Sequence, residues 1–468
     1  MNIVTLFRMV NVMVALAMGW VSETRAQQRL PPELAQAVAQ ITQNDVTATV
    51  TFLASDEMAG RDTPSPELTI ASAYVAARFR GAGLSGGANG SFYQKHQLKT
   101  EAMPSAGIAF TVDGQPAEHF GVLAADLNDF VWFGRVTQLE AVESQSEIQG
   151  AVLVDASAIE SPRDLFIFRR QLSQLANRGA KCILLQVDES SPVVGVARQA
   201  AKPRLVNPRT GKSLPTLLVG PFDMNEQVMV KIPKRRTGQT EVRNVIGVLP
   251  GSDPQLKNEA VLFTAHLDHV GTQEGLKDPV FNGADDNATG VTAVIELAKA
   301  FGSLEKAPKR TTLFMTFWGE ERGLLGSRYF ANQPTWPLDQ LVANINIEMV
   351  GRPEPGAAGK IWMTGWHQSD LGPMLADAAK AIDVRIFEHP QHSQPLYRAS
   401  DNYSFVEKGV VAHSFSAGSL HDDYHQPGDE WEKLELRHMT QVIQGLFVGS
   451  MPLANGEVTP KPSPRAGR

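Results

Sequence analysis

Continuous apolar runs alternate with amphipathic segments through the second half of the chain. The runs Val261–Leu267, Thr311–Trp318 and Val342–Met349 predict buried strands, because both faces of each would lie against other residues. The segments Val291–Phe301 and Leu324–Phe330 between them predict helices. This alternation predicts an α/β fold with a mixed, mostly parallel sheet sandwiched by helices, whose ligands collect at the carboxyl ends of the strands.

The first half of the chain contains two regions with different patterns of apolar and polar residues. Residues 31–98 show helical periodicity, with one helix ending near Leu53 after a cap at Asp45 or Thr47, and a second helix over Leu68–Phe79. Residues 106–234 instead contain short β-type runs such as Ala151–Val154. These short runs predict that residues 106–234 form a mainly-β insertion.

These residue patterns divide the chain into five predicted segments. They are a signal peptide at 1–26, the N-terminal part of the main domain at 27–105, the insertion at 106–234, the rest of the main domain at 235–452 and a disordered tail at 453–468.

The first 26 residues have the pattern of a secretory signal. Arg8 precedes an apolar run from Met9 to Trp20, and the small-residue end Thr24-Arg25-Ala26 follows. An uncleaved anchor is the less favoured alternative, because the apolar run is too short to span a bilayer. We therefore expect cleavage after Ala26, a periplasmic or secreted protein, and no stable membrane span after the signal is removed.

Composition excludes several classes of protein. The chain has 468 residues and a formal charge of -7, with 43 Lys and Arg against 50 Asp and Glu, so it offers no basic footprint for nucleic acid. Its one cysteine, Cys182, lies in an apolar run and predicts a buried thiol without a disulfide.

Acidic and histidine side chains follow several of the predicted strands. His266 and Asp268 come at the end of the first strand, two residues apart and on one face. Asp285 and Asp286 are adjacent carboxylates in a glycine-flanked turn, and such neighbours repel unless a cation neutralises them. Helix capping by Asp286 or Asn287 is the alternative, although one acid would suffice for a cap.

Further carboxylates follow the other strands. Glu320 and Glu321 come after the strand that ends at Trp318, where one glutamate can bind metal while the other moves a proton. Glu348 lies inside an otherwise apolar strand, where an unpaired carboxylate is costly. The loop from His421 to Asp429, which contains His425, adds imidazoles far along the chain.

Five motifs in this order, His-x-Asp, Gly-x-Asp-Asp-Asn-x-Thr-Gly, Gly-Glu-Glu-x-Gly-Leu-x-Gly-Ser, Glu-Met-Val-Gly and Asp-Tyr-His-x-Pro, resemble the di-zinc aminopeptidase family of secreted bacterial leucine aminopeptidases. The resemblance covers about residues 243–451. It implies that two zinc ions, replaceable by cobalt or manganese, are bound by His266, Asp286, Glu321, Glu348 and His425. Asp286 would bridge the ions, with His266 and Glu348 at one site and Glu321 and His425 at the other.

The same resemblance implies the catalytic roles. Glu320 matches the general base, Asp268 the acid that orients His266, and Tyr424 a hydroxyl that stabilises the oxyanion. Glu348 departs from the family, which often has aspartate there, and leaves the side-chain specificity open. The insertion resembles the protease-associated domain found in many of these enzymes and implies a noncatalytic role.

The expected activity is removal of N-terminal residues from peptides with a free N-terminus. Carboxypeptidases and dipeptidases share the scaffold, and then Arg352, Arg398 or Arg322 would bind a substrate carboxylate. Glutaminyl cyclases, which use a single zinc, are disfavoured by the full set of five ligands. A noncatalytic binding module is disfavoured because every ligand position holds a competent residue.

Several polar residues near these motifs are assigned no role. His269, His413, His421 and Asp422 are interpreted as supporting or loop polar groups rather than as ligands, and Asp401 and Asn402 as part of the site's architecture. The preferred first side chain, the native metal and the oligomeric state are not predicted.

Overall fold

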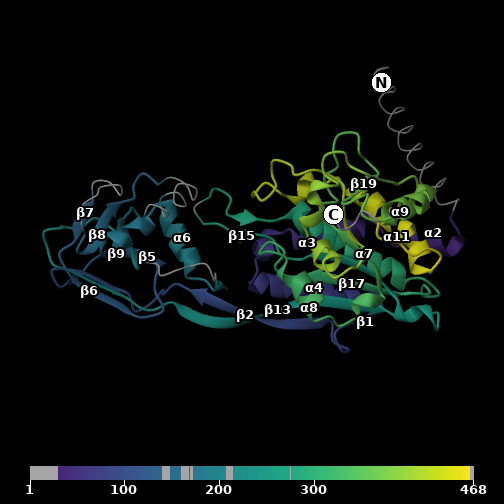
Figure 1. Cartoon of the computed structure of the whole chain (residues 1–468). Helices are drawn as coiled ribbons and strands as arrows, with labels where there is room; N and C mark the ends of the chain where they lie inside the picture. Colours follow the sequence, from purple (N-terminus) through teal and green to yellow (C-terminus); the bar gives the residue numbers. More distant parts are fainter. Residues whose placement is uncertain are drawn as a thin grey trace, which may run out of the picture. The chain divides into compact units, whose positions relative to one another are not determined.

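A computed structural model describes residues 30–139, 148–159, 168, 172–206, 214–274 and 276–463. The predicted signal peptide therefore lies outside the described residues. The chain divides into two compact units, the first formed by residues 1–95, 243–271 and 281–468 and the second by residues 96–242 and 272–280 (Figure 1).

The first unit is built on a mixed sheet, which confirms the predicted fold class. Its central strands β14, β17, β18 and β21 are mutually parallel neighbours, and antiparallel pairings with β13 and β19 flank them. The strand order is β10 (Arg204–Leu205), β2 (Tyr93–Ala102), β13 (Arg236–Leu249), β17 (Thr311–Phe317), β14 (Ala260–His266), β18 (Leu341–Ile347), β21 (Ala412–Ser416), β19 (Lys360–Met363) and β20 (Arg385–Phe387), with β1 (Ser85–Gly86) paired to β13.

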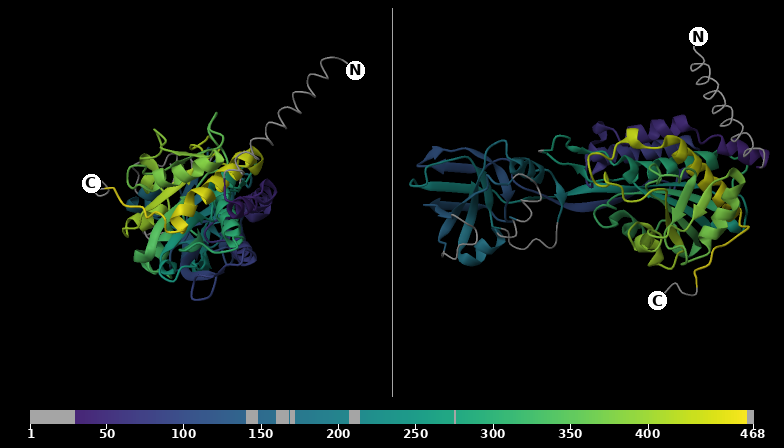
Figure 2. Two further views of the ribbon diagram at one scale, coloured as in Figure 1. Left: turned by 90° about the vertical axis from the view of Figure 1, so that its right-hand side faces the viewer. Right: turned by 90° about the horizontal axis from the view of Figure 1, so that it is seen from above.

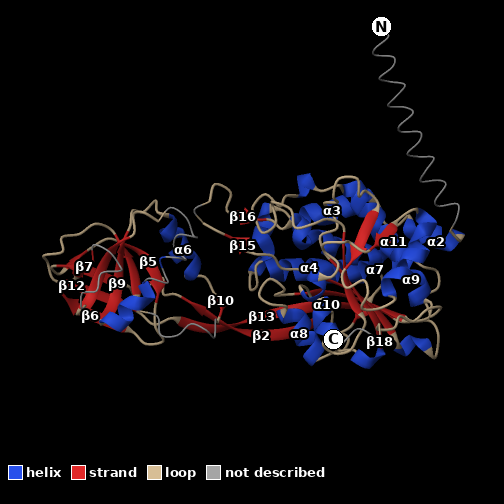
Figure 3. Ribbon diagram, turned by 45° about the horizontal axis from the view of Figure 1, so that its top comes forward, coloured by secondary structure: helices blue, strands red, loops and turns tan. Residues whose placement is uncertain are grey.

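Helices cover both faces of this sheet (Figure 3). Helices α3 (Gln43–Leu53), α4 (Pro66–Gly81), α7 (Gly290–Gly302) and α11 (Leu436–Ala454) pack against one another, and α7 lies on β14 and β17. The yellow α11 also lies beside the purple N-terminal helices, including α2 (Pro32–Val38), in both views of Figure 2. A separate group contains α8 (Leu325–Asn332), which contacts β17, and α10 (Asn402–Val406), which contacts β21. Helix α9 (Leu371–Ala379) packs on α11 and β20.

The amphipathic patterns place these helices well, although the caps differ in detail. Thr42, rather than Asp45 or Thr47, caps α3, and its side chain accepts a hydrogen bond from the Asp45 amide. Ser65 caps α4 in the same way. No helix among the described residues combines the length and apolar character needed to cross a bilayer.

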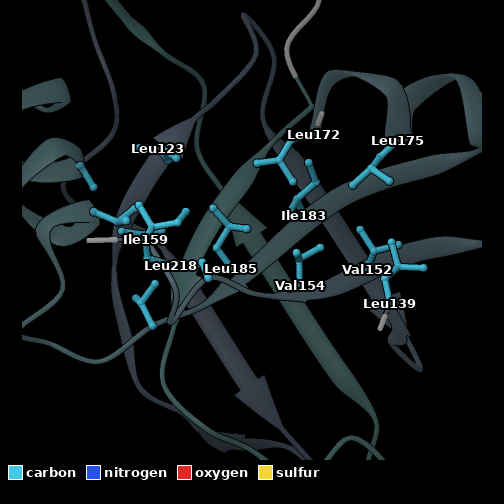
Figure 4. Packing of buried hydrophobic residues seen from close by; sticks show 14 of the residues in the cluster. Leu123, Leu139, Val152, Val154, Ile159, Leu172, Leu175, Ile183, Leu185 and Leu218 are labelled. Carbon is cyan, nitrogen blue, oxygen red and sulfur yellow. The ribbon is translucent and has the colours of Figure 1, made fainter. Parts of the chain in front are cut away.

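The second unit is mainly β and contains two sheets. One sheet has the order β5 (His119–Ala124), β11 (Thr216–Val219), β9 (Ala180–Gln186), β8 (Gly150–Asp155) and β7 (Thr137–Leu139). The other has the order β4 (Gln115–Pro116), β3 (Ala109–Val112), β12 (Val228–Ile232) and β6 (Phe130–Gly134). Leu185, Ile183 and Val152 from β9 and β8 belong to the same buried cluster as Leu175 (Figure 4), and α6 (Pro192–Ala200) adds Val193, Val194 and Ala197 to it. Cys182 is buried and unbonded, and burial raises the pKa of its thiol to about 12.

Two differences from the sequence-based segments concern their ends. The predicted insertion, 106–234, lies within the second unit, whose main segment runs over 96–242 because β2 and β13 continue beyond the predicted limits. Residues 453–463 of the predicted disordered tail are ordered by hydrogen bonds. The Lys461 amide donates to Asp370, and the Ser463 amide donates to the Gln368 carbonyl.

Candidate active site

Three parallel strands deliver acidic and histidine side chains to one edge of the sheet. β14 ends at His266, which is in register with Phe317 at the end of β17, and β18 runs parallel to β14. The residues that follow each strand therefore emerge at the same edge. Glu348 lies just past β18, which ends at Ile347, rather than inside it, and the next residue, Met349, has a φ of 49°.

The loop that carries Asp286 is held by a carboxylate from far along the chain. Asp429 accepts hydrogen bonds from the amides of Asp285 and Asp286 at 3.0 Å, and it is fully buried. Burial, reinforced by the charge of Asp285, raises the pKa of Asp429 to about 6. Asp285 itself accepts from the Gly351 amide at 2.8 Å, so its carboxylate shapes the loop while that of Asp286 faces the histidines.

The two oxygens of Asp286 face different histidines. Oδ1 lies 3.2 Å from Nε2 of His266, and Oδ2 lies 3.1 Å from Nε2 of His425. Burial would raise the pKa of Asp286, but its contacts with the histidines hold it well below its usual range. A carboxylate placed between two imidazoles in this way is suited to bridge two cations.

Nε2 of His425 faces two carboxylates without forming a hydrogen bond to either. Its Nε2 is 3.1 Å from Asp286 Oδ2 and 3.1 Å from Glu321 Oε1, yet it makes a hydrogen bond of acceptable geometry to neither. Three atoms at these separations face a common point, as the ligands of a zinc ion do. The donor set of imidazoles and carboxylates therefore fits zinc.

His266 lies near the two adjacent glutamates as well. Its ligand atom and those of Glu320 and Glu321 lie within 4.8 Å of one another. Glu348 belongs to no such group among the described residues. Its Oε1 accepts hydrogen bonds from Asn346, at 2.9 Å, and from Ser400. The structure thus brings four of the five predicted ligands together and places Glu348 beside hydrogen-bond donors at the same edge.

Negative charge is concentrated around Glu320. Burial raises the pKa of Glu320 well above its usual range, and the carboxylates of Glu348 and Asp401 add to this against the opposing effect of His266. Burial also raises the pKa of Asp401 to about 7. So many buried carboxylates are costly without a cation.

Asp268 acts on the site differently from the prediction. Nδ1 of His266 contacts the main-chain oxygen of Asp268 at 3.0 Å, whereas the Asp268 carboxylate accepts from the Glu320 amide at 3.1 Å and from the Thr63 hydroxyl at 3.0 Å. Thr63 in turn accepts from the Gly319 amide. The Asp268 side chain therefore fixes the backbone of the proposed base, and burial raises its pKa to about 6.

Arg61 joins the loops that carry the ligands, and it was not predicted. It is 1% exposed, and its guanidinium donates to the carbonyls of Leu267 at 2.9 Å, Asn282 at 2.9 Å and Gly283 at 3.0 Å, as well as to that of Leu53. Burial lowers the pKa of Arg61 to about 10, so it remains charged near neutral pH.

Tyr424 lies against the ligand side of the site. Its ring stacks on that of His425 with centroids 4.0 Å apart. Burial, with the charges of Asp286 and the glutamates, raises the pKa of Tyr424, so the hydroxyl keeps its proton. The side chain therefore remains a hydrogen-bond donor at neutral pH.

This part of the chain resembles a known family. Residues 244–447 match the sequence pattern described as Peptidase family M28. Aminopeptidase YwaD from Bacillus subtilis is 27% identical over 216 residues, which cover 44% of each protein. A probable glutamate carboxypeptidase from Arthroderma benhamiae is 34% identical over 264 residues, covering 48% of this chain and 32% of that protein. The chain thus spans less than half the length of these curated relatives.

The fold is similar to that of a solved enzyme over nearly its whole length. An aminopeptidase from Aneurinibacillus sp. strain AM-1 superimposes with a TM-score of 0.52 and 18% identity, covering 90% of this chain and 95% of that one. At this identity the likeness concerns the fold alone.

Proposed function

The chain carries a peptidase family M28 domain, and we propose that it is a zinc-dependent aminopeptidase that removes residues from the free N-termini of peptides. The observation that carries this proposal is the geometry of His425, Asp286 and Glu321, whose ligand atoms converge beside Glu320. A metal site next to an unliganded glutamate is the arrangement that hydrolysis by activated water requires.

The proposal includes two zinc ions per chain. The two oxygens of Asp286 support it, since each faces a different histidine. Metal analysis of the purified protein tests this point, with two equivalents expected. Asp286→Ala should lose both, because the bridging ligand serves both ions. Two equivalents bound to that variant would contradict the bridge.

When bound, zinc would act as a Lewis acid and lower the pKa of a coordinated water to about 7. Glu320 takes the proton from the attacking water and returns it to the leaving amine. Asp268 holds Glu320 in place through its main-chain amide. The Tyr424 hydroxyl, which stays protonated, donates a hydrogen bond to the developing oxyanion.

A carboxypeptidase is the second candidate, since one of the curated relatives is named as a probable glutamate carboxypeptidase. Such an enzyme needs a cation for the substrate carboxylate. Arg322 is bound to Asp62 at 2.5 Å, and Arg352 is bound to Asp423 at 2.8 Å. Arg398 lies over the ring of Tyr403, at 5.5 Å from its centroid. The pairing of two of these three arginines with acids favours the aminopeptidase.

Other parts of the proposal concern the rest of the chain. The second unit would be a noncatalytic protease-associated domain, since every proposed ligand and catalytic residue lies in the first unit. The proposal also includes cleavage after Ala26 and export to the periplasm or the medium. N-terminal sequencing of the protein from each cell fraction tests the export proposal.

The deciding experiment is hydrolysis of one short peptide by the zinc-loaded protein, with its N-terminus free or acetylated, each with and without a chelator. Chelator-sensitive cleavage of the free form alone supports the aminopeptidase. Cleavage of both forms would overturn it in favour of a carboxypeptidase or endopeptidase. Cleavage of neither would favour a glutaminyl cyclase or a binding module.

A further inference from the structure

We propose that His269 binds metal through Nδ1 as a fourth protein ligand, beside Asp286, Glu321 and His425. This inference rests on the proposed function and concerns one of its two metal sites. The sequence offered His269 only as a supporting polar group, because it follows the ligand His266 by three residues in a predicted loop.

The separations of the four donor atoms match a tetrahedral ion. His269 Nδ1 is 3.1 Å from Glu321 Oε1 and 3.7 Å from Asp286 Oδ2, and His425 Nε2 is 3.1 Å from each of these oxygens. All four atoms lie within 4.8 Å of one another. Ligands about 2.1 Å from a tetrahedral zinc are about 3.4 Å apart, which is the range found here.

The imidazole of His269 is held in this position from all sides. The side chain is fully buried, and its ring meets that of His425 edge-on with centroids 5.4 Å apart. Gly283, with a φ of 58°, leaves the space that the ring occupies, since a Cβ there would lie 2.4 Å from Cγ of His269. A pre-positioned imidazole binds metal without the entropy cost of ordering its side chain.

Nδ1 of His269 faces a carboxylate, and Nε2 faces no hydrogen-bond partner. Among the described residues Nδ1 lies within hydrogen-bond distance of Glu321 Oε1, at 3.1 Å, and Nε2 is buried without a partner. With a cation between Nδ1 and the carboxylates, Nδ1 would offer its lone pair and the ring proton would lie on Nε2.

A second group of histidines shows the opposite arrangement. Glu354, His389 and His392 also place ligand atoms within 4.8 Å of one another. However, Nδ1 of His389 accepts from the amides of Gln391 at 3.1 Å and His392 at 3.2 Å, so Nε2 carries the proton of the neutral ring. That nitrogen has no lone pair for a metal and instead lies 3.3 Å from Glu354.

With four protein ligands this site would keep fewer exchangeable positions for water than the site on the side of His266. The two ions would therefore differ in affinity, and the ion held by His269 would be the harder one to remove.

The test compares three variants of the full-length protein by zinc affinity, measured by competition with a chromophoric chelator. His269→Ala should weaken one of the two zinc equivalents by more than about 100-fold, beyond the 10- to 100-fold that loss of a supporting hydrogen bond costs. His269→Asn places an amide N–H near the position of Nδ1–H, so it should restore a hydrogen bond to Glu321 but not ligation. His389→Gln is the matched control and should leave both affinities unchanged. Circular dichroism confirms folding in each case.

Full restoration of affinity by His269→Asn would overturn the inference, because a hydrogen bond would then suffice. A crystal structure of the zinc-loaded protein gives the second measurement, with Nδ1 expected at about 2.0–2.1 Å from the ion. A distance above about 3 Å, with zinc on the other three ligands, would also overturn it but leave the proposed function standing. Absence of zinc from the Asp286 site would overturn both.

Discussion

The edge of the sheet in the first unit and the core of the second unit are both buried, but they bury opposite kinds of side chain. The core cluster of the second unit drawn in Figure 4 consists of Leu, Ile, Val and Ala, which need only close packing. At the sheet edge Asp268, Asp286 and Asp429 are almost fully buried beside the glutamates. Burial of charge costs free energy that apolar packing does not, so the first region is built for binding and the second for stability.

The largest expected effect is a loss of catalytic rate without a loss of stability. Glu320→Gln should lower kcat by about 10²- to 10⁴-fold, because the amide cannot accept the proton of the attacking water. Zinc content and melting temperature should stay near those of the parent protein. Steady-state kinetics on a short peptide, with metal analysis of the same sample, checks this. A near-normal kcat in zinc-replete protein would remove Glu320 from its role.

Arg61→Lys should reduce stability and zinc affinity together. A lysine cannot reach the carbonyls of Leu267, Asn282 and Gly283 at once, and each buried acceptor left without a donor costs about 1–3 kcal/mol. We expect a loss of about 3–5 kcal/mol in urea unfolding. Arg198→Lys is the control, since that side chain is 58% exposed and its partner Glu189 is 74% exposed, so their pair should contribute little. Equal effects of the two substitutions would refute a special role for Arg61.

Leu185→Ala should affect the second unit alone. Leu185 is fully buried among aliphatic side chains, and such truncations cost about 2–5 kcal/mol through lost contacts and the cavity left behind. The substitution should lower the melting transition of the second unit but keep kcat on a dipeptide within about twofold. A kcat loss as large as that of Glu320→Gln would show that the second unit takes part in catalysis.

The smallest expected effect depends on pH. His413 is buried between the Thr364 carbonyl and the Ser369 hydroxyl, and burial lowers its pKa to about 4 from 6.5. As the pH falls below 6.5 the unfolded chain takes up this proton first, so stability declines between pH 6.5 and 4 by up to about 3 kcal/mol. His413→Asn should flatten this decline relative to the parent, as followed by urea unfolding at each pH. Parallel pH profiles would contradict the assignment.

Much of the fold of the first unit was predictable because its strands are buried on both faces. The apolar run Val261–Leu267 differs from β14 by one residue at each end, and its last polar residues mark the site. The cap of α3 was less accessible, since Thr42 and Asp45 are both suitable cap residues.

The contacts that assemble the site were not predictable from local pattern. The local sequence around Arg61 is typical of a polar surface loop. The side chain is nevertheless buried against the loop that follows β14, where it donates to the Leu267 carbonyl. The local sequence around Asp429 is typical of a turn. Only the tertiary fold shows that its carboxylate accepts a hydrogen bond from the Asp286 amide. His269 directly follows the His-x-Asp motif at His266 and Asp268. Whether its imidazole can bind a metal or only supports the site depends on the direction of the ring, which the sequence does not give.

The contact of Asp429 with the amides of Asp285 and Asp286 spans about 144 residues of chain. During synthesis the turn that carries Asp286 leaves the ribosome long before the carboxylate that shapes it. The turn can therefore reach its folded geometry only after the segment around Asp429 has docked onto it. The geometry around Asp286 is thus a property of the folded domain and not of the local sequence of the turn.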